Sequence, residues 1–113
     1  MLVKQVGLRI TLVLIGVDAR TGETSIIQES CSVIEGETSY EAAAAILFQI
    51  TGLKTTWVQI QPSSFKELDS TITVYYNARI DRELVPKHGY FWTPILNFSG
   101  EQLRLLTDIV RSC

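Results

Sequence analysis

The chain has little of what several classes of protein require. Its two cysteines, Cys31 and Cys113, are far apart and outside any CxxC or Cys/His grouping, so we expect free thiols and no zinc site. The single histidine, His88, lies in the loop-like stretch "PKHGY" with no nucleophile signature beside it, which argues against a Ser/His/Asp or Cys/His catalytic set. No GxGxxG or P-loop pattern occurs, so the sequence predicts no phosphate-cradling glycine loop.

Strong charge and long hydrophobic runs are missing as well. The formal net charge is -2, which gives no electrostatic reason to expect nucleic acid or an anionic membrane as a partner. The longest apolar run near the start, residues 12–17, is far shorter than a membrane span. Nothing resembles a signal peptide. We therefore expect a cytoplasmic protein with no nucleic-acid partner and no membrane partner.

What is present fits one globular domain over residues 1–113, because 46% of the residues are apolar and only 19% are charged. Apolar or alternating runs predict strands at 6–17, 24–34, 55–61 ("TTWVQIQ") and 70–80 ("STITVYYNARI"), with a hairpin between the first two. Pro62 is expected to end the third strand, and "SSFKELDS" (63–70) is predicted to be a loop. A short extended piece is expected at 90–92.

Two helices are marked by their ends. Thr38 with Glu41 forms a predicted capping box, and Gly52 supplies a stop, so a helix is expected over Ser39–Thr51. Ser99 with Gln102 predicts a second capping box before a terminal amphipathic helix, whose apolar stripe is Leu103, Leu106 and Val110. Strands and helices in this order favour an α/β (α+β) fold with helices packed on a mixed sheet.

The first helix, "SYEAAAAILFQIT", lacks the polar face that a surface helix normally shows. With its flanks it resembles the loop-helix-loop of the MutT-like Nudix hydrolases, whose box reads G, five residues, E, seven residues, then REUxEExGU, with U aliphatic. Without any gap, Glu37 falls on the first glutamate, Leu47 on an aliphatic position, and Gly52 and Leu53 on the final pair. The resemblance implies a Nudix-like mixed β-sheet sandwiched between helices.

Other positions of the box depart from the family pattern. Its first glycine falls on Cys31, its arginine on Ala45, the next glutamate on Ile46, and the glutamate pair on Gln49 and Ile50. In the family these glutamates hold divalent metal beside a diphosphate while water attacks phosphorus. The resemblance therefore implies a catalytic set reduced to Glu37, no metal site and no cofactor, and we expect that the protein is not an enzyme.

Isoleucines in place of acids make both faces of the helix apolar, so something must cover Ile46 and Ile50. One cover is the protein itself, through the stretch 63–70 or "VPKHGYFW" (85–92). Another is a protein partner or a homodimer, with Ala45, Ile46, Phe48 and Ile50 as the interface. A third is a nucleotide-like small molecule held by Arg9, Arg79, Tyr75 and Trp92, although Trp92 could instead pack under the last helix.

These alternatives lead to one expected function and one competitor. The expected function is a catalytically degenerate Nudix-like domain that acts as a binding or assembly module. The competitor is a Nudix-type hydrolase of nucleoside diphosphate derivatives that uses magnesium at a non-standard site. That site would join Glu37 to carboxylates such as Glu67, Asp69 or Asp81.

Overall fold

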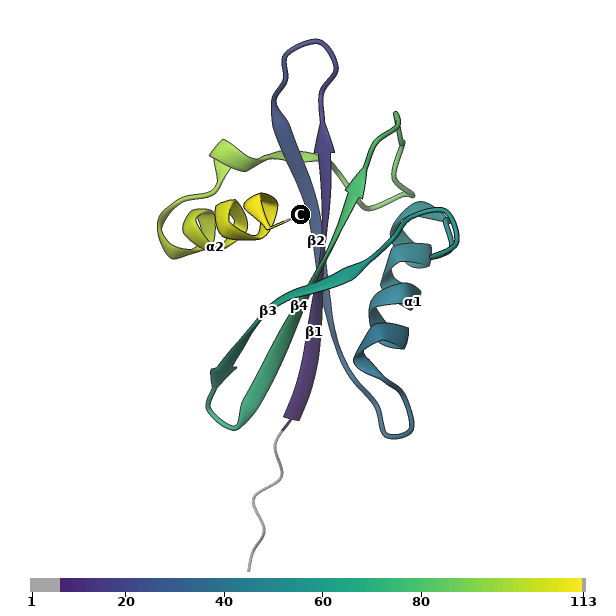
Figure 1. Cartoon of the computed structure of the whole chain (residues 1–113), viewed down its shortest axis with the longest axis vertical. Helices are drawn as coiled ribbons and strands as arrows, with labels where there is room; N and C mark the ends of the chain where they lie inside the picture. The colour runs from purple at the N-terminus through teal and green to yellow at the C-terminus, as the bar shows by residue number, and fades with distance from the viewer. Residues whose placement is uncertain (1–6, 113) are drawn as a thin grey trace, which may run out of the picture.

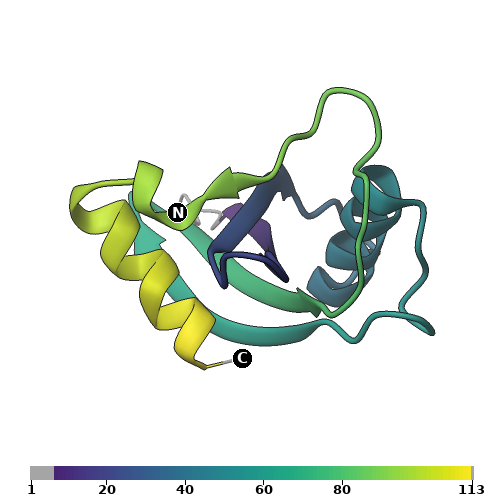
Figure 2. The same ribbon diagram turned by 90° about the horizontal axis from the view of Figure 1, so that it is seen from above.

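The computed structural model describes residues 7–112, which form one mixed five-stranded sheet with a helix on each face (Figure 1). Seen from above, α1 and α2 lie on opposite sides of the sheet (Figure 2). The expected strand start at Val6 and the thiol of Cys113 lie outside the described residues. The elements are β1 (Gly7–Val17), β2 (Thr24–Ser32), α1 (Ser39–Thr51), β3 (Gln61–Leu68), β4 (Thr71–Ile80), β5 (Thr93–Pro94), the short 3₁₀ helix η1 (Ile95–Asn97) and α2 (Gly100–Arg111).

The strand order is β3-β4-β1-β2-β5, with β1 in the centre. β1 pairs antiparallel with β2 and parallel with β4, while β3 and β5 are antiparallel edge strands. The parallel strands β1 and β4 cannot be joined by a tight turn. The long connection between them contains β2, α1 and β3. The predicted α+β class, a mixed sheet between helices, is confirmed.

β1 divides the core into two layers. Its residues Ile10, Leu12 and Leu14 are buried on the α1 side, and Val13 and Ile15 are buried on the α2 side. Alternate residues of a strand point to opposite faces, so a strand covered on both faces needs a continuous apolar run. Burial of each such side chain contributes about 1.5–3 kcal/mol, which makes β1 a large contributor to core stability.

α1 begins and ends where the sequence predicts. The Thr38 hydroxyl accepts a hydrogen bond from the Glu41 N–H at 3.0 Å, and the Glu41 carboxylate accepts one from the Thr38 N–H at 3.3 Å. Gly52 ends the helix in the left-handed region (φ 76°), where its N–H donates to the Phe48 carbonyl. A residue with a side chain would be strained there. The capping box and the glycine stop are confirmed.

The predicted hairpin between β1 and β2 is also confirmed. The Asp18 carboxylate accepts hydrogen bonds from the backbone N–H groups of Arg20 at 2.7 Å and Thr21 at 3.2 Å, which folds the turn. The same two N–H groups, Arg20 first, hold the pKa of Asp18 below its usual value. β2 ends at Ser32, two residues earlier than predicted.

The third strand was predicted in the wrong place. Residues 55–57 form a turn, closed by the Trp57 N–H bonding to the Lys54 carbonyl, and β3 then runs from Gln61 through Pro62 to Leu68. The stretch 63–68, predicted as a loop, is therefore strand. Pro62 is tolerated because β3 is an edge strand and its pairing with β4 is irregular between Pro62 and Ser64. Val58 and Ile60 gave this segment its strand-like alternation of apolar residues. Both pack into the core, but from a segment that is not a strand.

The alternation of residues 70–80 predicts one apolar face, which includes Tyr76, Ala78 and Ile80, and one wet face, which includes Tyr75 and Asn77. The structure has the first face but not a wholly wet second one. Tyr76, Ala78 and Ile80 are buried on the α1 side, as expected. On the other face Asn77 is only 1% exposed, and Tyr75 packs against the core layer beneath α2. The alternating pattern was correct, and the second helix supplies a cover that the strand's own sequence does not reveal.

α2 begins after the predicted cap residue, Ser99, but it lacks the predicted capping bond and its apolar stripe is shifted. Ser99 is the N-cap, but its side chain makes no capping hydrogen bond, so the predicted second capping box is wrong. Leu106 and Ile109 are the buried residues of the helix, while Leu103 and Val110 are only half-buried. No helix within residues 7–112 combines the length and apolar content needed to span a membrane.

Candidate functional site

The family resemblance directs attention to α1 and the loop before it. Glu37, the remaining box glutamate, is half-buried in that loop. It is close enough to Cys31 for its negative charge to help raise the pKa of the thiol, although burial is the larger cause. Glu41 lies one turn further on and is held by the capping box.

The positions that carry arginine and glutamates in the family are split between surface and core. Ile46 and Ile50 are 4% and 0% exposed and belong to the core layer on the α1 side. Ala45 and Gln49 are exposed, and the Gln49 amide donates a hydrogen bond to the Tyr90 hydroxyl. The helix presents no carboxylate from any of these four positions.

Residues 81–92, which we call the covering segment, fold over the C-terminal half of α1. The Lys87 N–H donates to the Ile50 carbonyl at 2.8 Å, one of the carbonyls that the end of a helix leaves free. The Trp92 indole N–H donates to the Leu84 carbonyl at 3.0 Å, which closes the segment on itself. Leu84, Tyr90 and Trp92 pack against the core layer that contains Ile46 and Ile50.

This arrangement corrects part of the predicted interface. Ile46 and Ile50 are covered by the protein itself, so neither is available at the surface as a contact residue. The stretch 85–92 is one of the two covers that the sequence suggested, whereas 63–68 is strand. Phe48, 50% exposed, and Ala45 remain on the outer face of α1. Their role as contact residues stays a prediction.

The described carboxylates do not gather into a metal site. Within residues 7–112 no group of three or more His, Cys, Asp or Glu side chains is placed to hold one ion. Glu67 and Asp69 lie at the hairpin between β3 and β4, whereas Asp81 follows the opposite end of β4. A strand of ten residues separates these positions by roughly 30 Å. These three carboxylates therefore cannot serve one ion together.

The predicted ligand-binding residues are divided by the sheet. Arg9 and Arg79 are in register with Thr73 and Ile15, which places them with Tyr75 on the α2 side. The two arginines are nevertheless six residues apart along the strands, roughly 20 Å. Trp92 packs on the α1 side, where a Cβ at Gly16 would lie 3.0 Å from its ring. The prediction that these four residues hold one ligand is wrong, and so is the alternative that Trp92 packs under α2.

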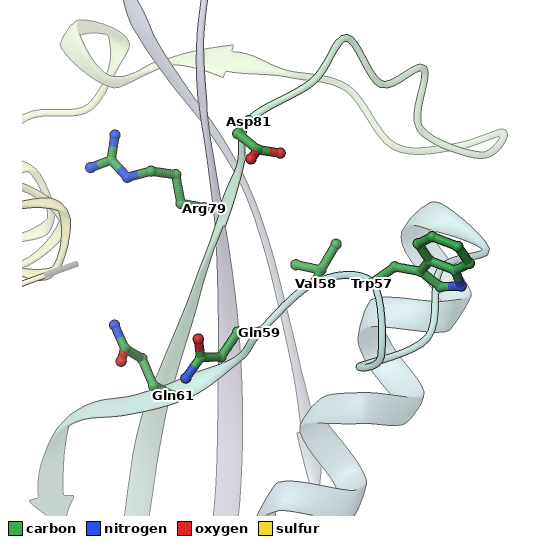
Figure 3. Close-up of a pocket in the computed structure, with 6 residues that line it drawn as sticks. All are labelled: Trp57, Val58, Gln59, Gln61, Arg79 and Asp81. Carbon is green, nitrogen blue, oxygen red and sulfur yellow. The ribbon is translucent and has the colours of Figure 1, made fainter.

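Of those four residues Arg79 lines a groove whose other walls sequence reasoning missed. The groove has a volume of about 390 Å³ and lies where the segment before β3 crosses the end of β4 (Figure 3). Figure 3 shows Arg79 and Asp81 pointing to opposite sides of β4. The lining residues are Trp57, Val58, Gln59, Gln61, Arg79 and Asp81. No signal marked this groove, because Trp57 and Gln59 had been assigned to a strand.

Comparisons with known proteins identify the fold. No family model matches the sequence, and no curated protein matches it significantly. Solved structures of MutT/Nudix proteins do match. A mutT/nudix family protein from Listeria innocua has a TM-score of 0.73 at 14% identity, over 96% of this chain and 94% of that one. The NUDIX domain of Shewanella oneidensis NrtR, complexed with ADP ribose, has a TM-score of 0.68 at 12% identity, over 97% and 89%.

A MutT/nudix family protein from Enterococcus faecalis matches with a TM-score of 0.65 at 13% identity. The match covers 81% of this chain but only 45% of that protein, so the chain spans less than half of its length. At this level of identity the likenesses establish the Nudix fold, which the box-like spacing had predicted. They say nothing about which chemistry the fold carries here.

Proposed function

We propose that this chain is a Nudix-fold module that binds a protein partner and does not hydrolyse nucleotides. One observation carries the proposal. Ile46 and Ile50, at the positions of two family glutamates, are built into a core layer against which residues 81–92 pack. A carboxylate at Ile50 would have to be buried without a partner, so the helix is constructed around its apolar residues.

The chemistry of the fold family supports this proposal. Hydrolysis of a phosphoanhydride by this route needs several carboxylate oxygens around a divalent ion that neutralises the developing charge. Across the described part of the chain no cluster of three candidate ligands exists. Glu41 already accepts a backbone hydrogen bond in the capping box. Glu37 alone is a poor magnesium site, and we therefore assign no cofactor.

The exposed part of α1 offers the binding surface. Phe48 lies half-exposed on the outer face, next to exposed Ala45. The Lys87 ammonium lies 5.4 Å from the centre of the Phe48 ring, a cation–π distance. Aromatic side chains are enriched at protein contact sites, and Phe48 keeps half of its surface in water. The partner would be another protein or a second copy of this chain.

Substitution of Phe48 tests the surface. We expect Phe48→Glu to weaken binding to a partner captured from the source cells and then purified, by roughly 30-fold or more, because a central aromatic contact is worth about 2 kcal/mol. Phe91→Glu is the matched control, since Phe91 is 78% exposed and lies in a different segment. Titration calorimetry measures both. If wild-type protein captures no partner and stays monomeric at high concentration, the binding role is wrong.

The hydrolase alternative is tested with nucleotides. ADP ribose is a suitable probe because the NrtR NUDIX domain was solved in complex with it. We expect no release of AMP and ribose 5-phosphate in the presence of Mg²⁺ or Mn²⁺, and the same result after treatment with a chelator. Turnover that requires the metal and disappears in Glu37→Gln would instead establish the hydrolase.

A further inference from the structure

Among residues 7–112, the outer edge of β3 has no partner strand. β3 is the first strand in the sheet order and pairs only with β4. Within residues 7–112 no turn, loop or cap hydrogen bond involves the backbone of β3. Alternate backbone N–H and C=O groups of such a strand point away from its neighbour and can accept another strand. Figure 1 shows the β3–β4 hairpin extending away from both helices.

Large apolar side chains lie exposed on this edge. Phe65 is 73% exposed and sits beside Val74 on the α1 face of the sheet, while Leu68 is exposed on the other face. α1 packs over β1 and β2 and leaves the Phe65 end of the hairpin open. α2 approaches the start of β3, where the Ser112 and Ser63 hydroxyls are 3.3 Å apart. A sheet edge with exposed apolar side chains on both faces favours association.

We propose that the occupant of this edge is β3 of a second copy, paired antiparallel so that two sheets become one. Two antiparallel strands are related by a two-fold axis perpendicular to the sheet, which is the symmetry of the commonest protein dimers. With that axis, residues that face each other across the new pair must lie on the same face of the sheet. The sum of their residue numbers is therefore even.

The charges of β3 select one register. Lys66 and Glu67 are its only charged residues. A pair centred on Lys66 would set two lysines opposite each other, and a pair centred on Glu67 would set two glutamates opposite each other, both unfavourable. A pair centred on Ser64 would run onto the irregular part of the strand and Pro62, which has no N–H to donate. Centring on Phe65 sets no like charges opposite each other, and it moves Pro62 out to the last pair of the strand, opposite Leu68.

In this register Phe65 stacks on its own copy across the axis, and Lys66 faces Ser64 of the second copy. Aromatic pairs are among the better cross-strand contacts. Edge strands that stay unpaired are usually protected by proline, bulges or charge. β3 has its proline and its irregularity at one end only, so residues 64–68 keep a regular edge. This dimer uses a different surface from α1 and leaves Phe48 free.

Solution mass tests the dimer. By sedimentation equilibrium we expect the full chain to reach twice its 12.7 kDa mass as concentration rises to about 1 mM. Phe65→Lys should remain monomeric, and Phe91→Lys, the same change at an equally exposed phenylalanine, should dimerise like wild type. A monomeric wild type, or equal behaviour of the two variants, would overturn the proposal. Circular dichroism confirms that both variants are folded.

Two substitutions of Ser64 test the register. Ser64→Glu places a carboxylate opposite Lys66 of the second copy, twice in each dimer, so the dimer should tighten by about 2- to 30-fold. Ser64→Lys places two lysine pairs there and should weaken it by a similar factor, and added salt should reduce both effects. Equal affinities for the two variants would show that this register is wrong.

The dimer and the proposed function fail separately. If Phe48→Glu abolishes the dimer and Phe65→Lys does not, α1 is the dimer surface and the β3 proposal is wrong. If Phe65→Lys abolishes the dimer while Phe48→Glu changes neither mass nor partner binding, the β3 edge stands. The proposal that Phe48 on α1 is a contact residue is then wrong.

Discussion

At the scale of single residues, neighbouring positions of α1 have different environments. Gln49 is exposed and bonds to the Tyr90 hydroxyl, whereas Ile50 is fully buried. In the box pattern both positions carry glutamate. Glutamate at position 49 would therefore lie in water, whereas glutamate at position 50 would be buried. These two substitutions form a matched pair that tests the packing of the core.

We expect Ile50→Glu to lower the free energy of unfolding by at least about 3 kcal/mol, because it buries an unpaired carboxylate. Gln49→Glu should change it by less than about 0.5 kcal/mol, because the side chain stays in water and can accept the Tyr90 hydroxyl hydrogen. Urea unfolding measures both values. Equal stabilities would mean that Ile50 is not part of the packed core.

Residue-level reasoning from sequence worked where the signal was local. Thr38, Glu41 and Gly52 predicted both ends of α1 because a cap is made by residues three or four apart. It failed where the deciding contact was distant. Nothing near Trp92 in sequence shows that its ring lies against Gly16, and nothing near Asn77 shows that it is buried on the α2 side of the sheet.

At the scale of elements, the two helix starts differ although their sequences look alike. Thr38 makes its side-chain bond to the Glu41 N–H, while Ser99 makes none in the structure. The pattern of a capping box is thus present twice and formed once. A hydroxyl residue predicts the place of a helix start more safely than it predicts the hydrogen bond.

Thr38→Ala should therefore lower the free energy of unfolding by about 0.5–2 kcal/mol, the usual cost of losing a side-chain cap. Ser99→Ala should cost less than about 0.5 kcal/mol, because no cap bond is lost. Thermal or urea denaturation of the two variants is a sufficient measurement. A larger loss in Ser99→Ala would mean that its hydroxyl caps α2 in solution.

The strand elements explain the remaining errors. The alternation of β4 predicted its two faces, but the cover on the second face comes from α2, about 30 residues further along the chain. β3 was missed because proline usually ends a strand, and only its place at the sheet edge makes Pro62 acceptable. Strand order is a property of the whole sheet and cannot be seen in one segment.

At the scale of the whole molecule, the covering segment joins α1 to the sheet through few contacts. The Lys87 N–H bonds to the Ile50 carbonyl, and Trp92 anchors the segment against the core. Such segments open at lower free energy than the elements beneath them. We expect residues 81–92 to open without unfolding of α1.

Trp92→Ala should accordingly speed hydrogen exchange of the Lys87 amide, because the anchor that holds the segment of Lys87 against its acceptor, the Ile50 carbonyl, is lost. The Gly52 amide bonds within the helix end, to the Phe48 carbonyl, and should keep its protection. Exchange followed by NMR separates the two amides. Equal loss of protection at both would mean that the segment and the helix open as one unit.

Some of the candidate ligand residues could be placed from the sequence, and others only from the whole structure. The sequence placed Tyr75 and Arg79 on one face of β4 correctly, since that follows from alternation alone. It could not place Trp92, which reaches the sheet through the irregular segment 81–92. The carboxylates Glu67 and Asp81 were likewise near in sequence to β4 but lie at its two ends.

The central strand has one further consequence. Even-numbered residues of β1 from Ile10 to Leu14 serve the layer beneath α1, and Val13 and Ile15 serve the layer beneath α2. One residue inserted or deleted at its midpoint would make the following half exchange its two sets of side chains. Substitutions of similar volume can be absorbed locally, but a change of length cannot. Variation in length should therefore be confined to the turns, such as residues 18–23.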